Sequence, residues 1–308
     1  MFNDEGALTD LLRALASHGY RFTSVTPATH ERVVARRSQG SHLRDLLGWS
    51  LPVPAGAVPR GVRTCLERAG VLEETDGLLR SKVRVSSLGG LLFLHSSFPT
   101  ASENAVFFGP DTYRFARFIE AELRGSGPVQ RLVDVGAGSG AGGLYAATLL
   151  PGTRIVLLDV NAQALQLAAA NARAAGIDAE LVHGSTLDAV AGEIELAIAN
   201  PPFVMDEDGR AYRDGGGMHG AQLSLDWTLQ AAHRVLPGGR VLLYTGSAVV
   251  DGRDALKAGL QERLSDADYG LRYEELDPDI FGEELDRPAY REVERIAAVG
   301  AAILKKRA

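Results

Sequence analysis

From residue 131 onward the chain alternates short apolar strands with helical segments, and this alternation restricts its fold more than any other feature. Residues 131–135, 154–159, 179–183, 194–199 and 240–245 have the composition of buried strands. Residues 141–149, 162–175 and 221–235 have helical periodicity, and Gly176 and Pro237-Gly238-Gly239 are helix stops. The alternation predicts a parallel sheet with helices on both faces. Two closing strands are expected at 269–276 and 296–304.

The first hundred residues have a different pattern. Helices are expected at 8–18, opened by Thr9 or Asp10, and at 42–47 and 58–69. Short strands around 71–73, 77–79 and 83–85 follow them and predict a small β-ribbon. Helix, helix and ribbon resemble a winged helix. We therefore expect a winged-helix-like, α-rich domain for substrate recognition or docking over 1–104, and a second domain over 105–308.

Bulk composition narrows the class of protein. Of the 308 residues, 45% are hydrophobic and 23% are charged, which favours a packed core over disorder. There is no apolar run near the roughly 20 residues that a membrane span needs, and the first ten residues are acidic where a signal peptide would be basic. The single cysteine, Cys65, excludes an intrachain disulfide and cysteine-rich zinc modules. We expect a cytoplasmic, metal-free protein with no membrane partner.

The net charge of −7 is concentrated after residue 125, and the first 125 residues have a slight basic excess. A nucleic-acid-binding protein usually has a stronger basic field. The charge therefore permits nucleic-acid binding without arguing for it.

A glycine-rich segment, residues 134–140, follows the first strand of the second domain and opens a helix. Its glycines let the backbone approach a bound nucleoside, and the helix N-terminal N–H groups then face the ligand. The candidate cofactor contacts here are Asp134, Gly136, Ala137, Gly138 and Gly140. The same glycine spacing also fits the dinucleotide fingerprint, and a plain glycine-rich turn is the structural alternative.

Asp159 ends the next strand, where its carboxylate can accept hydrogen bonds from both hydroxyls of a ribose. This contact would serve a nicotinamide dinucleotide as well as S-adenosylmethionine (SAM), so it does not separate the two cofactors. Val160, the next residue, is also a candidate cofactor contact.

The segment Asn200-Pro201-Pro202-Phe203 follows the strand at 194–199. An amide or nucleobase nitrogen is a poor nucleophile, because its lone pair is delocalised. Two acceptors, the Asn200 side-chain oxygen and the Pro201 carbonyl, could bind its two hydrogens and favour the developing positive charge. The prolines stiffen the loop, and Phe203 could stack on the planar group. A Pro-Pro turn with a buried Phe is the structural alternative.

Over about residues 105–305 these motifs together resemble the class I SAM-dependent methyltransferases that carry an Asn/Asp-Pro-Pro-aromatic motif. That group modifies exocyclic amines of adenine or guanine and the side-chain amide of glutamine. The resemblance implies an α/β, Rossmann-like, seven-stranded sheet in the order 3-2-1-4-5-7-6 with strand 7 antiparallel. It also implies that SAM binds at the carboxyl ends of the central strands.

Two segments are similar to the HemK-like branch, which methylates glutamine in peptide-chain release factors. Residues 109–113 resemble its Arg-Pro-Asp-Thr-Glu segment, which implies that Thr112 lies near the cofactor and Tyr113 near the substrate. Residues 212–220, which begin with Tyr212, resemble its Gly-Gly-x-x-Gly stretch. That likeness implies a loop that folds over the substrate, and its candidate contacts are Arg213, Gly215 and Gly216.

Three residues depart from the pattern of that branch. Tyr113 stands in place of Glu, Phe203 in place of the usual Tyr, and Ser185 where many methyltransferases have an acidic residue for the adenine amine. The expected acceptor is a protein glutamine of the release-factor type, and the alternative is adenine N6 or guanine N2 in RNA or DNA. A small-metabolite methyltransferase, an NAD-dependent oxidoreductase and a non-catalytic SAM-binding module remain as further readings.

Overall fold

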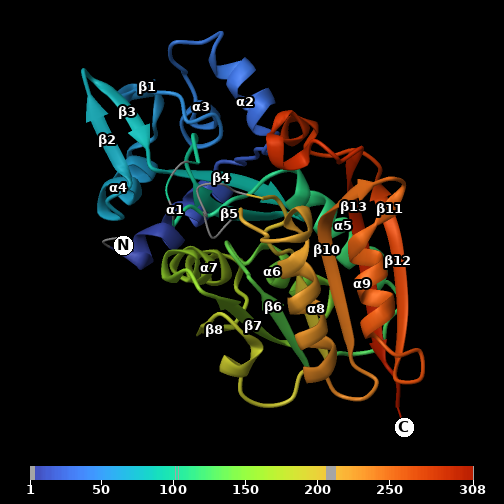
Figure 1. The fold of residues 1–308 in the computed structure, drawn as a ribbon. Coiled ribbons are helices and arrows are strands. Elements are labelled where there is room, and N and C mark those ends of the chain that lie inside the picture. The colour runs from blue at the N-terminus through green and yellow to red at the C-terminus, as the bar shows by residue number, and fades with distance from the viewer. Residues whose placement is uncertain (1–3, 101, 103, 206–212, 308) are drawn as a thin grey trace.

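The computed structural model describes residues 4–100, 102, 104–205 and 213–307. Its centre is a sheet in which seven strands form one continuous path, with the short β11 (Arg253–Asp254) paired to β10 (Figure 1). In sheet order the strands are β12 (Tyr269–Asp277), β13 (Arg295–Lys305), β10 (Arg240–Val250), β9 (Leu196–Ala199), β6 (Arg131–Val135), β7 (Arg154–Asp159) and β8 (Ala179–His183).

The connectivity of this sheet confirms the predicted topology. Strands β6 to β10 run parallel to one another, whereas β13 is antiparallel to both β10 and β12. When the seven strands of the path are numbered in chain order, the sheet reads 3-2-1-4-5-7-6 with strand 7 antiparallel. The chain therefore has the α/β, Rossmann-like fold expected from its sequence.

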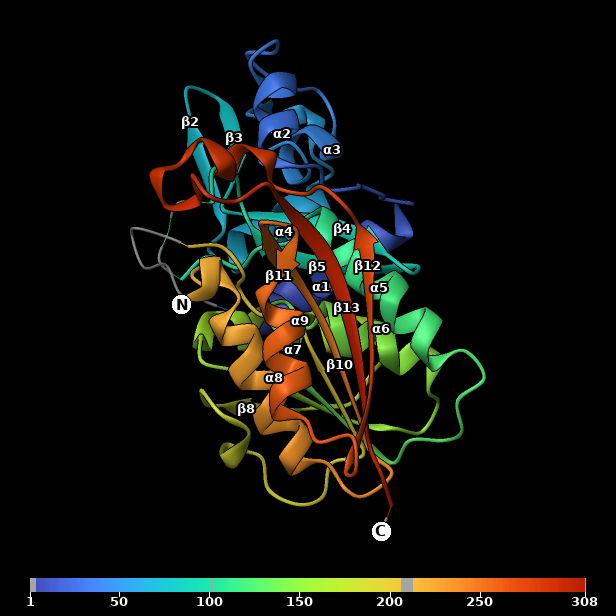
Figure 2. The same ribbon diagram turned by 45° about the vertical axis from the view of Figure 1, so that its right-hand side comes forward.

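Helices cover both faces of the sheet because successive strand residues point to opposite sides. Leu132 packs into a core with α5 (Pro110–Leu123) and α6 (Ala141–Leu149). Its neighbour Val133 packs on the other face with α8 (Gln222–Arg234) and α9 (Ala255–Arg263). Figure 2, turned by 45°, shows α8 and α9 together in front of the sheet.

Local capping explains why α7 (Ala162–Ala175) has the bounds that its sequence predicts. The Asn161 side chain accepts hydrogen bonds from the backbone N–H groups of Gln163 and Ala164, which satisfies the first turn. The helix ends at Gly176, which takes the left-handed conformation with φ +69°. Both signals are local in sequence, so they are visible without the tertiary structure.

The N-terminal region contains the three predicted helices and the β-ribbon, together with a helix at Pro27–Val34 and a short strand at Val53–Pro54 that were not predicted. Strands β1, β3 and β2 form a three-stranded antiparallel sheet in that order. The elements of the N-terminal region up to this sheet are α1 (Glu5–Ser17), α2 (Pro27–Val34), α3 (Leu43–Leu47), β1 (Val53–Pro54), α4 (Arg60–Arg68), β2 (Leu72–Thr75) and β3 (Leu78–Ser81).

Two expectations for this region were wrong. Helix α1 begins after Asp4, whose side chain accepts a hydrogen bond from the Ala7 N–H, and not at Thr9 or Asp10. The strand expected at 83–85 does not belong to the ribbon: it is part of β4 (Val83–Leu88), which pairs with β5 (Leu91–Ser96) in a separate hairpin. Strand β5 was not predicted, and its pairing explains why β4 leaves the ribbon.

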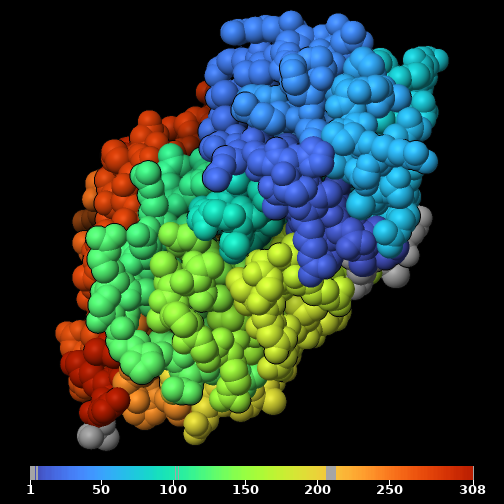
Figure 3. Space-filling view, turned by 180° about the vertical axis from the view of Figure 1, so that it is seen from behind, coloured from blue at the N-terminus to red at the C-terminus, as the bar shows by residue number. Residues whose placement is uncertain are grey.

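The N-terminal region packs on the second part of the chain through α7. Leu8 and Leu11 of α1 share an apolar core with Ala164 and Leu167 of α7. From behind, the N-terminal region continues into the remaining surface without a break (Figure 3). The division at residue 104 remains a prediction. Within the described residues, no helix is long and apolar enough to span a bilayer.

Candidate functional site

The candidate residues converge because three neighbouring strands end at the same edge of the sheet. Val135, the last residue of β6, pairs with Ala199 of β9 on one side and with Leu158 of β7 on the other. Gly136, Asp159 and Asn200 are each one residue beyond these paired positions. Neighbouring strands are about 4.8 Å apart, so these three residues lie side by side. The strand order reverses between the parallel strands β6 and β9, and ligands bind at such a switch point in open α/β sheets.

The glycine-rich segment after β6 has a shape that only glycine permits. Gly136, Gly138 and Gly140 have φ angles of +71°, +55° and +78°. A Cβ on Gly136 would lie 2.6 Å from the ring of Trp227 in α8. The backbone is therefore closely covered on that side. Ala137 donates its backbone N–H to the Leu158 carbonyl at 3.0 Å, so the segment is also fixed to β7.

Asp159 is tied to the glycine-rich segment. One of its carboxylate oxygens accepts from the Gly138 N–H at 2.7 Å and the other from the Asn161 N–H at 2.8 Å. Burial raises its pKa, and the backbone hydrogen bonds act in the opposite direction. Each carboxylate oxygen keeps a further lone pair that a ribose hydroxyl could use. Val160, beside it, is a large apolar residue that is 55% exposed.

Asp134 is almost fully buried and faces the first turn of α6. Its carboxylate accepts from the Gly143 N–H at 2.7 Å. Burial raises the pKa of this carboxyl group to about 7, and the Gly143 hydrogen bond and the charge of Asp159 are the smaller influences. The described contact thus fixes α6 to β6. Contact of Asp134 with the amino-acid end of a cofactor remains a prediction.

The Asn-Pro-Pro-Phe motif leaves β9 directly into this edge. The Asn200 side-chain oxygen is buried and has no hydrogen-bond partner among the residues that the structure describes. A buried acceptor without a partner costs free energy, so such an atom calls for an explanation. Pro201 and Pro202 follow outside any helix or strand, and their rings restrict the backbone. The fold itself makes no use of this oxygen, which leaves it free for a ligand.

Phe203 is more enclosed than the sequence suggested. Its side chain is only 9% exposed. Its ring lies against the backbone of β10, where a Cβ on Gly246 would be 2.4 Å from the ring. The ring of Phe281 contacts it edge-on, with ring centroids 5.3 Å apart and an interplanar angle of 82°. Little of the Phe203 ring is therefore left for stacking on an acceptor.

The glycine-rich loop after the motif packs directly on it. Val204 and Asp214 form an isolated parallel bridge, and the Gly215 N–H donates to the Val204 carbonyl at 2.8 Å. A Cβ on Gly215 would lie 1.8 Å from the Gly220 carbonyl oxygen and 2.7 Å from that of Pro202. Only glycine fits at this position.

Two other residues of this loop are placed less centrally. Arg213 forms an ion pair with Glu284, a carboxylate that is 3% exposed. Gly216 takes the left-handed conformation, with φ +75°. Tyr212 lies outside the described residues.

Thr112, Tyr113 and Ser185 occupy different surroundings. Thr112 is buried and caps α5, because its hydroxyl accepts from the Gly109 N–H. The Tyr113 hydroxyl accepts from the Ser24 N–H of the N-terminal region at 3.0 Å. Ser185 is exposed beyond the end of β8. Tyr113 thus joins the N-terminal region to α5, and the proposed ligand contacts of all three residues remain predictions.

Sequence reasoning missed several residues that shape the site. Asn171 of α7 is fully enclosed: it accepts from the Leu94 N–H and donates to the carbonyls of Leu94 and Ser139. It therefore links β5 to the glycine-rich segment. The sequence feature that could have indicated this role is the asparagine side chain of Asn171 among the alanines of α7. Tyr290 and Phe281, from the segment between β12 and β13, had no local signal.

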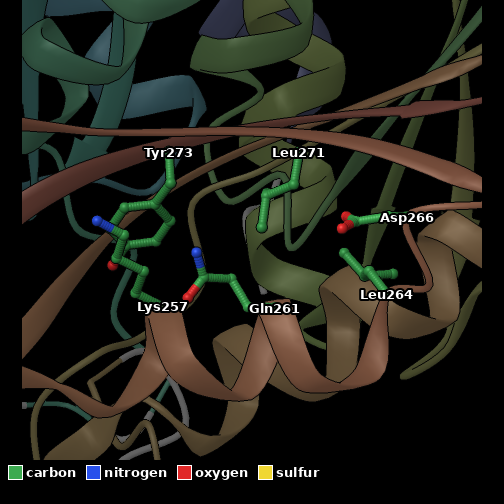
Figure 4. A pocket seen from close by; sticks show the side chains of 6 residues that line it. All are labelled: Lys257, Gln261, Leu264, Asp266, Leu271 and Tyr273. Atoms are coloured by element: carbon green, nitrogen blue, oxygen red, sulfur yellow. The ribbon is translucent and has the colours of Figure 1, made fainter.

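A separate cavity of about 230 Å³ lies between α9 and β12 (Figure 4). Lys257 and Gln261 project into it from the helix, and Leu271 and Tyr273 from the strand. None of its lining residues belongs to the motif or to the glycine-rich segments. Among the residues that the structure describes, no group of three or more His, Cys, Asp or Glu side chains could hold a metal ion.

Comparison with protein families finds the methyltransferase small domain at residues 114–213. The chain is 30% identical over 196 residues to the release factor glutamine methyltransferase of Deinococcus radiodurans, covering 60% of this chain and 66% of that protein. It is 32% identical over 120 residues to ribosomal RNA small subunit methyltransferase C of Ectopseudomonas mendocina, covering 39% of this chain and 33% of that protein. The chain thus spans less than two thirds of each relative's length.

Two solved structures share the fold at low identity. A Pyrococcus horikoshii protein described as a transferase has a TM-score of 0.53 and 11% identity, with 99% of this chain and 100% of that chain covered. Trm5b from Pyrococcus abyssi has a TM-score of 0.51 and 12% identity, with 81% and 72% covered.

Proposed function

We propose that this chain, which carries a methyltransferase small domain on the class I methyltransferase fold, binds SAM and methylates a planar nitrogen. The observation that carries the proposal is the buried Asn200 oxygen, which has no partner within the described part of the chain and lies at the strand end beside the glycine-rich segment. An acceptor N–H group is the kind of partner that this oxygen lacks.

The residues at the carboxyl edge suit SAM. Asp159 would bind the ribose hydroxyls, and Val160 offers an exposed apolar surface next to it for the adenine. The backbone of Gly136 and Gly138, free of Cβ atoms, would admit the cofactor closely. The glycine-rich segment and Asp159 at the end of β7 would also suit a dinucleotide. The choice of SAM therefore depends on Asn200 and on the family match.

When bound, SAM would supply a sulfonium-activated methyl carbon. The protein's part is to hold the acceptor nitrogen in line with that carbon. The Asn200 oxygen would accept one N–H and the Pro201 carbonyl the other, which favours positive charge developing on nitrogen. Pro202 and the closely packed Gly215 fix this segment before the acceptor arrives. Positioning and fixed dipoles would then provide most of the rate enhancement.

A glutamine side chain in a protein is our preferred acceptor. The similarity to the release factor glutamine methyltransferase extends over more of this chain than the similarity to the ribosomal RNA enzyme. The net charge of −7 also favours a protein acceptor over RNA or DNA. An exocyclic amine of adenine or guanine remains the second candidate, because the chain is also similar to a ribosomal RNA methyltransferase.

Two measurements test the proposal. Isothermal titration with SAM, S-adenosylhomocysteine and NAD separates the cofactors, and tight NAD binding with no SAM heat would overturn it. Lysate incubated with SAM that is labelled on its methyl group is then separated into protein, RNA, DNA and small molecules. Label in a protein glutamine supports the first acceptor, and label in RNA or DNA supports the second. Label only in small molecules, or in none of these fractions, contradicts both.

A further inference from the structure

Phe281 has a backbone conformation that aromatic residues rarely adopt. It lies in the segment 278–294 between β12 and β13, with φ +55° and ψ 38°, immediately before the 3-10 helix η4 (Gly282–Asp286). A bulky side chain at positive φ is an outlier that the surrounding structure must stabilise. Figure 1 shows this segment, in red, at the end of the sheet that faces the N-terminal region.

Hydrogen bonds fix the backbone around Phe281. The Ile280 N–H donates to the Ile296 carbonyl at 2.8 Å, and the Glu284 N–H donates to the Phe281 carbonyl at 2.9 Å. The buried Glu284 carboxylate also binds Arg287 at 2.8 Å and forms the ion pair with Arg213. The conformation of Phe281 is therefore tied to the loop that follows the Asn-Pro-Pro-Phe motif.

A second set of contacts joins the same two segments. The Tyr290 hydroxyl accepts from the Met205 N–H at 2.7 Å and donates to the His219 carbonyl at 3.4 Å. Arg287 donates to the Met205 carbonyl at 2.9 Å. The segment 278–294 and the chain around the motif thus form one connected unit, and Phe281 is held in place relative to Phe203.

The two phenylalanines differ in how much surface they leave free. Phe203 is only 9% exposed, because Gly246 of β10 lies against its ring and Phe281 contacts it edge-on. Phe281 is only partly buried. A planar acceptor that reaches Asn200 therefore meets little of Phe203, and the ring in contact with Phe203 belongs to Phe281, the less buried residue of the two.

We propose that Phe281 is a second acceptor-contacting residue, which with Phe203 forms an aromatic corner that selects a flat amide or nucleobase amine. The proposal rests on the proposed function and adds to it a residue outside the motif. An alternative is that Phe281 only supports the Phe203 ring. The two readings differ in what a Phe281 substitution changes: acceptor binding in the first case, and stability and motif geometry in the second.

The test compares Phe281→Leu, which keeps apolar bulk, with Phe281→Tyr, which keeps the ring. Leu285→Ala is the matched control, because Leu285 is a partly buried residue of the same segment that packs into the same core. The acceptor is the cellular fraction that wild-type protein labels from SAM. A glutamine-containing peptide, adenosine and guanosine serve as binding probes for the complex with S-adenosylhomocysteine.

Phe281→Leu is expected to raise the KM for the acceptor about three- to tenfold, the range of an aromatic contact beyond its buried area. Its affinity for SAM should stay within about twofold of wild type, and Phe281→Tyr should restore the KM. An unchanged KM in Phe281→Leu overturns the proposal. A change in KM matched by Leu285→Ala, or failure of all three probes to bind wild-type protein, overturns it too.

The two proposals can fail separately. If wild-type protein transfers no label to any fraction, the proposed function fails, while probe binding still tests Phe281. If wild-type protein transfers label and Phe281→Leu behaves identically, only the role of Phe281 fails.

Discussion

Asn200→Ala should abolish most methyl transfer without destabilising the fold. The substitution removes an oxygen that is buried and makes no hydrogen bond to any residue that the structure describes. If this oxygen binds the acceptor nitrogen as charge develops, its loss resembles the removal of one oxyanion-hole donor. Such losses lower kcat by about 10² to 10³, or roughly 2.7–4 kcal/mol. SAM affinity should change little, because Asn200 is assigned to the acceptor.

The small effect expected of Asn200→Ala on the free energy of unfolding follows from the missing hydrogen-bond partner of Asn200. Leaving a buried acceptor unpaired costs about 1–3 kcal/mol, and the alanine variant relieves that cost. The lost packing of a small side chain works in the opposite direction, so the free energy of unfolding should stay within about 1 kcal/mol of wild type.

Asn171→Ala is the matched control for this argument. Asn171 is also a buried asparagine, but its side chain makes three hydrogen bonds, two to Leu94 and one to Ser139. Its removal leaves buried backbone groups unpaired, at about 2–3 kcal/mol in total. The melting temperature should fall by roughly 4–12 °C, at about 2–4 °C per kcal/mol for a large domain.

Thermal unfolding and single-turnover transfer at saturating SAM measure both quantities on the same preparations. An Asn200→Ala protein that is destabilised as strongly as Asn171→Ala would mean that the Asn200 oxygen stabilises the fold. An Asn200→Ala protein that binds SAM and keeps full turnover would refute the assigned chemistry.

Three further predictions follow from the same contacts. Gly215→Ala places a Cβ 1.8 Å from a backbone oxygen. It should lower the rate of methyl transfer more than about tenfold, while the SAM affinity measured by titration stays unchanged. In the control, Gly217→Ala, the nearest atom to the added Cβ is 3.9 Å away, so this variant should behave as wild type. Asp159→Ala should weaken SAM binding about 10- to 100-fold in isothermal titration; an unchanged affinity would remove Asp159 from the cofactor site. The pKa of Asp134 rises from 3.8 to about 7 on folding. Its contribution to the free energy of unfolding is therefore present in acid and is lost as the pH rises between those values. In Asp134→Asn, the free energy of unfolding measured with urea should change less over that pH range.

Where a signal is local, the sequence was sufficient to predict the structure. The predicted bounds of α7 are confirmed: Gly176 ends the helix as expected, and the structure shows Asn161 as its N-cap, a local signal that the sequence also contains. Strand β10 runs five residues beyond the predicted end at 245, because its second half pairs with β13. That extension depends on a partner some fifty residues later in the chain, so a local pattern could not indicate it. Helix α5 was missed because its first turn was treated only as a motif.

The same distinction applies to the site. Gly136, Asp159 and Asn200 could be brought together from sequence, because each ends a predicted parallel strand and such ends share one edge. The Phe203–Phe281 contact joins two segments that no periodicity links. The bonds of Asn171 to Leu94 likewise cross 77 positions of the chain. Such contacts follow from the packed tertiary structure alone.

Two features around the motif are locally unfavourable, and together they point to function. Among the described residues, Asn200 leaves a buried oxygen unpaired, and Phe281 holds a bulky side chain at positive φ. Single substitutions could remove either state in a segment selected for stability alone. They persist side by side at one end of the sheet, where Glu284 and Tyr290 hold the two segments together. Strain that clusters where strands converge is best explained by a ligand that uses it. Occupation of the site by cofactor and acceptor should therefore satisfy the Asn200 oxygen and raise the melting temperature more than cofactor alone.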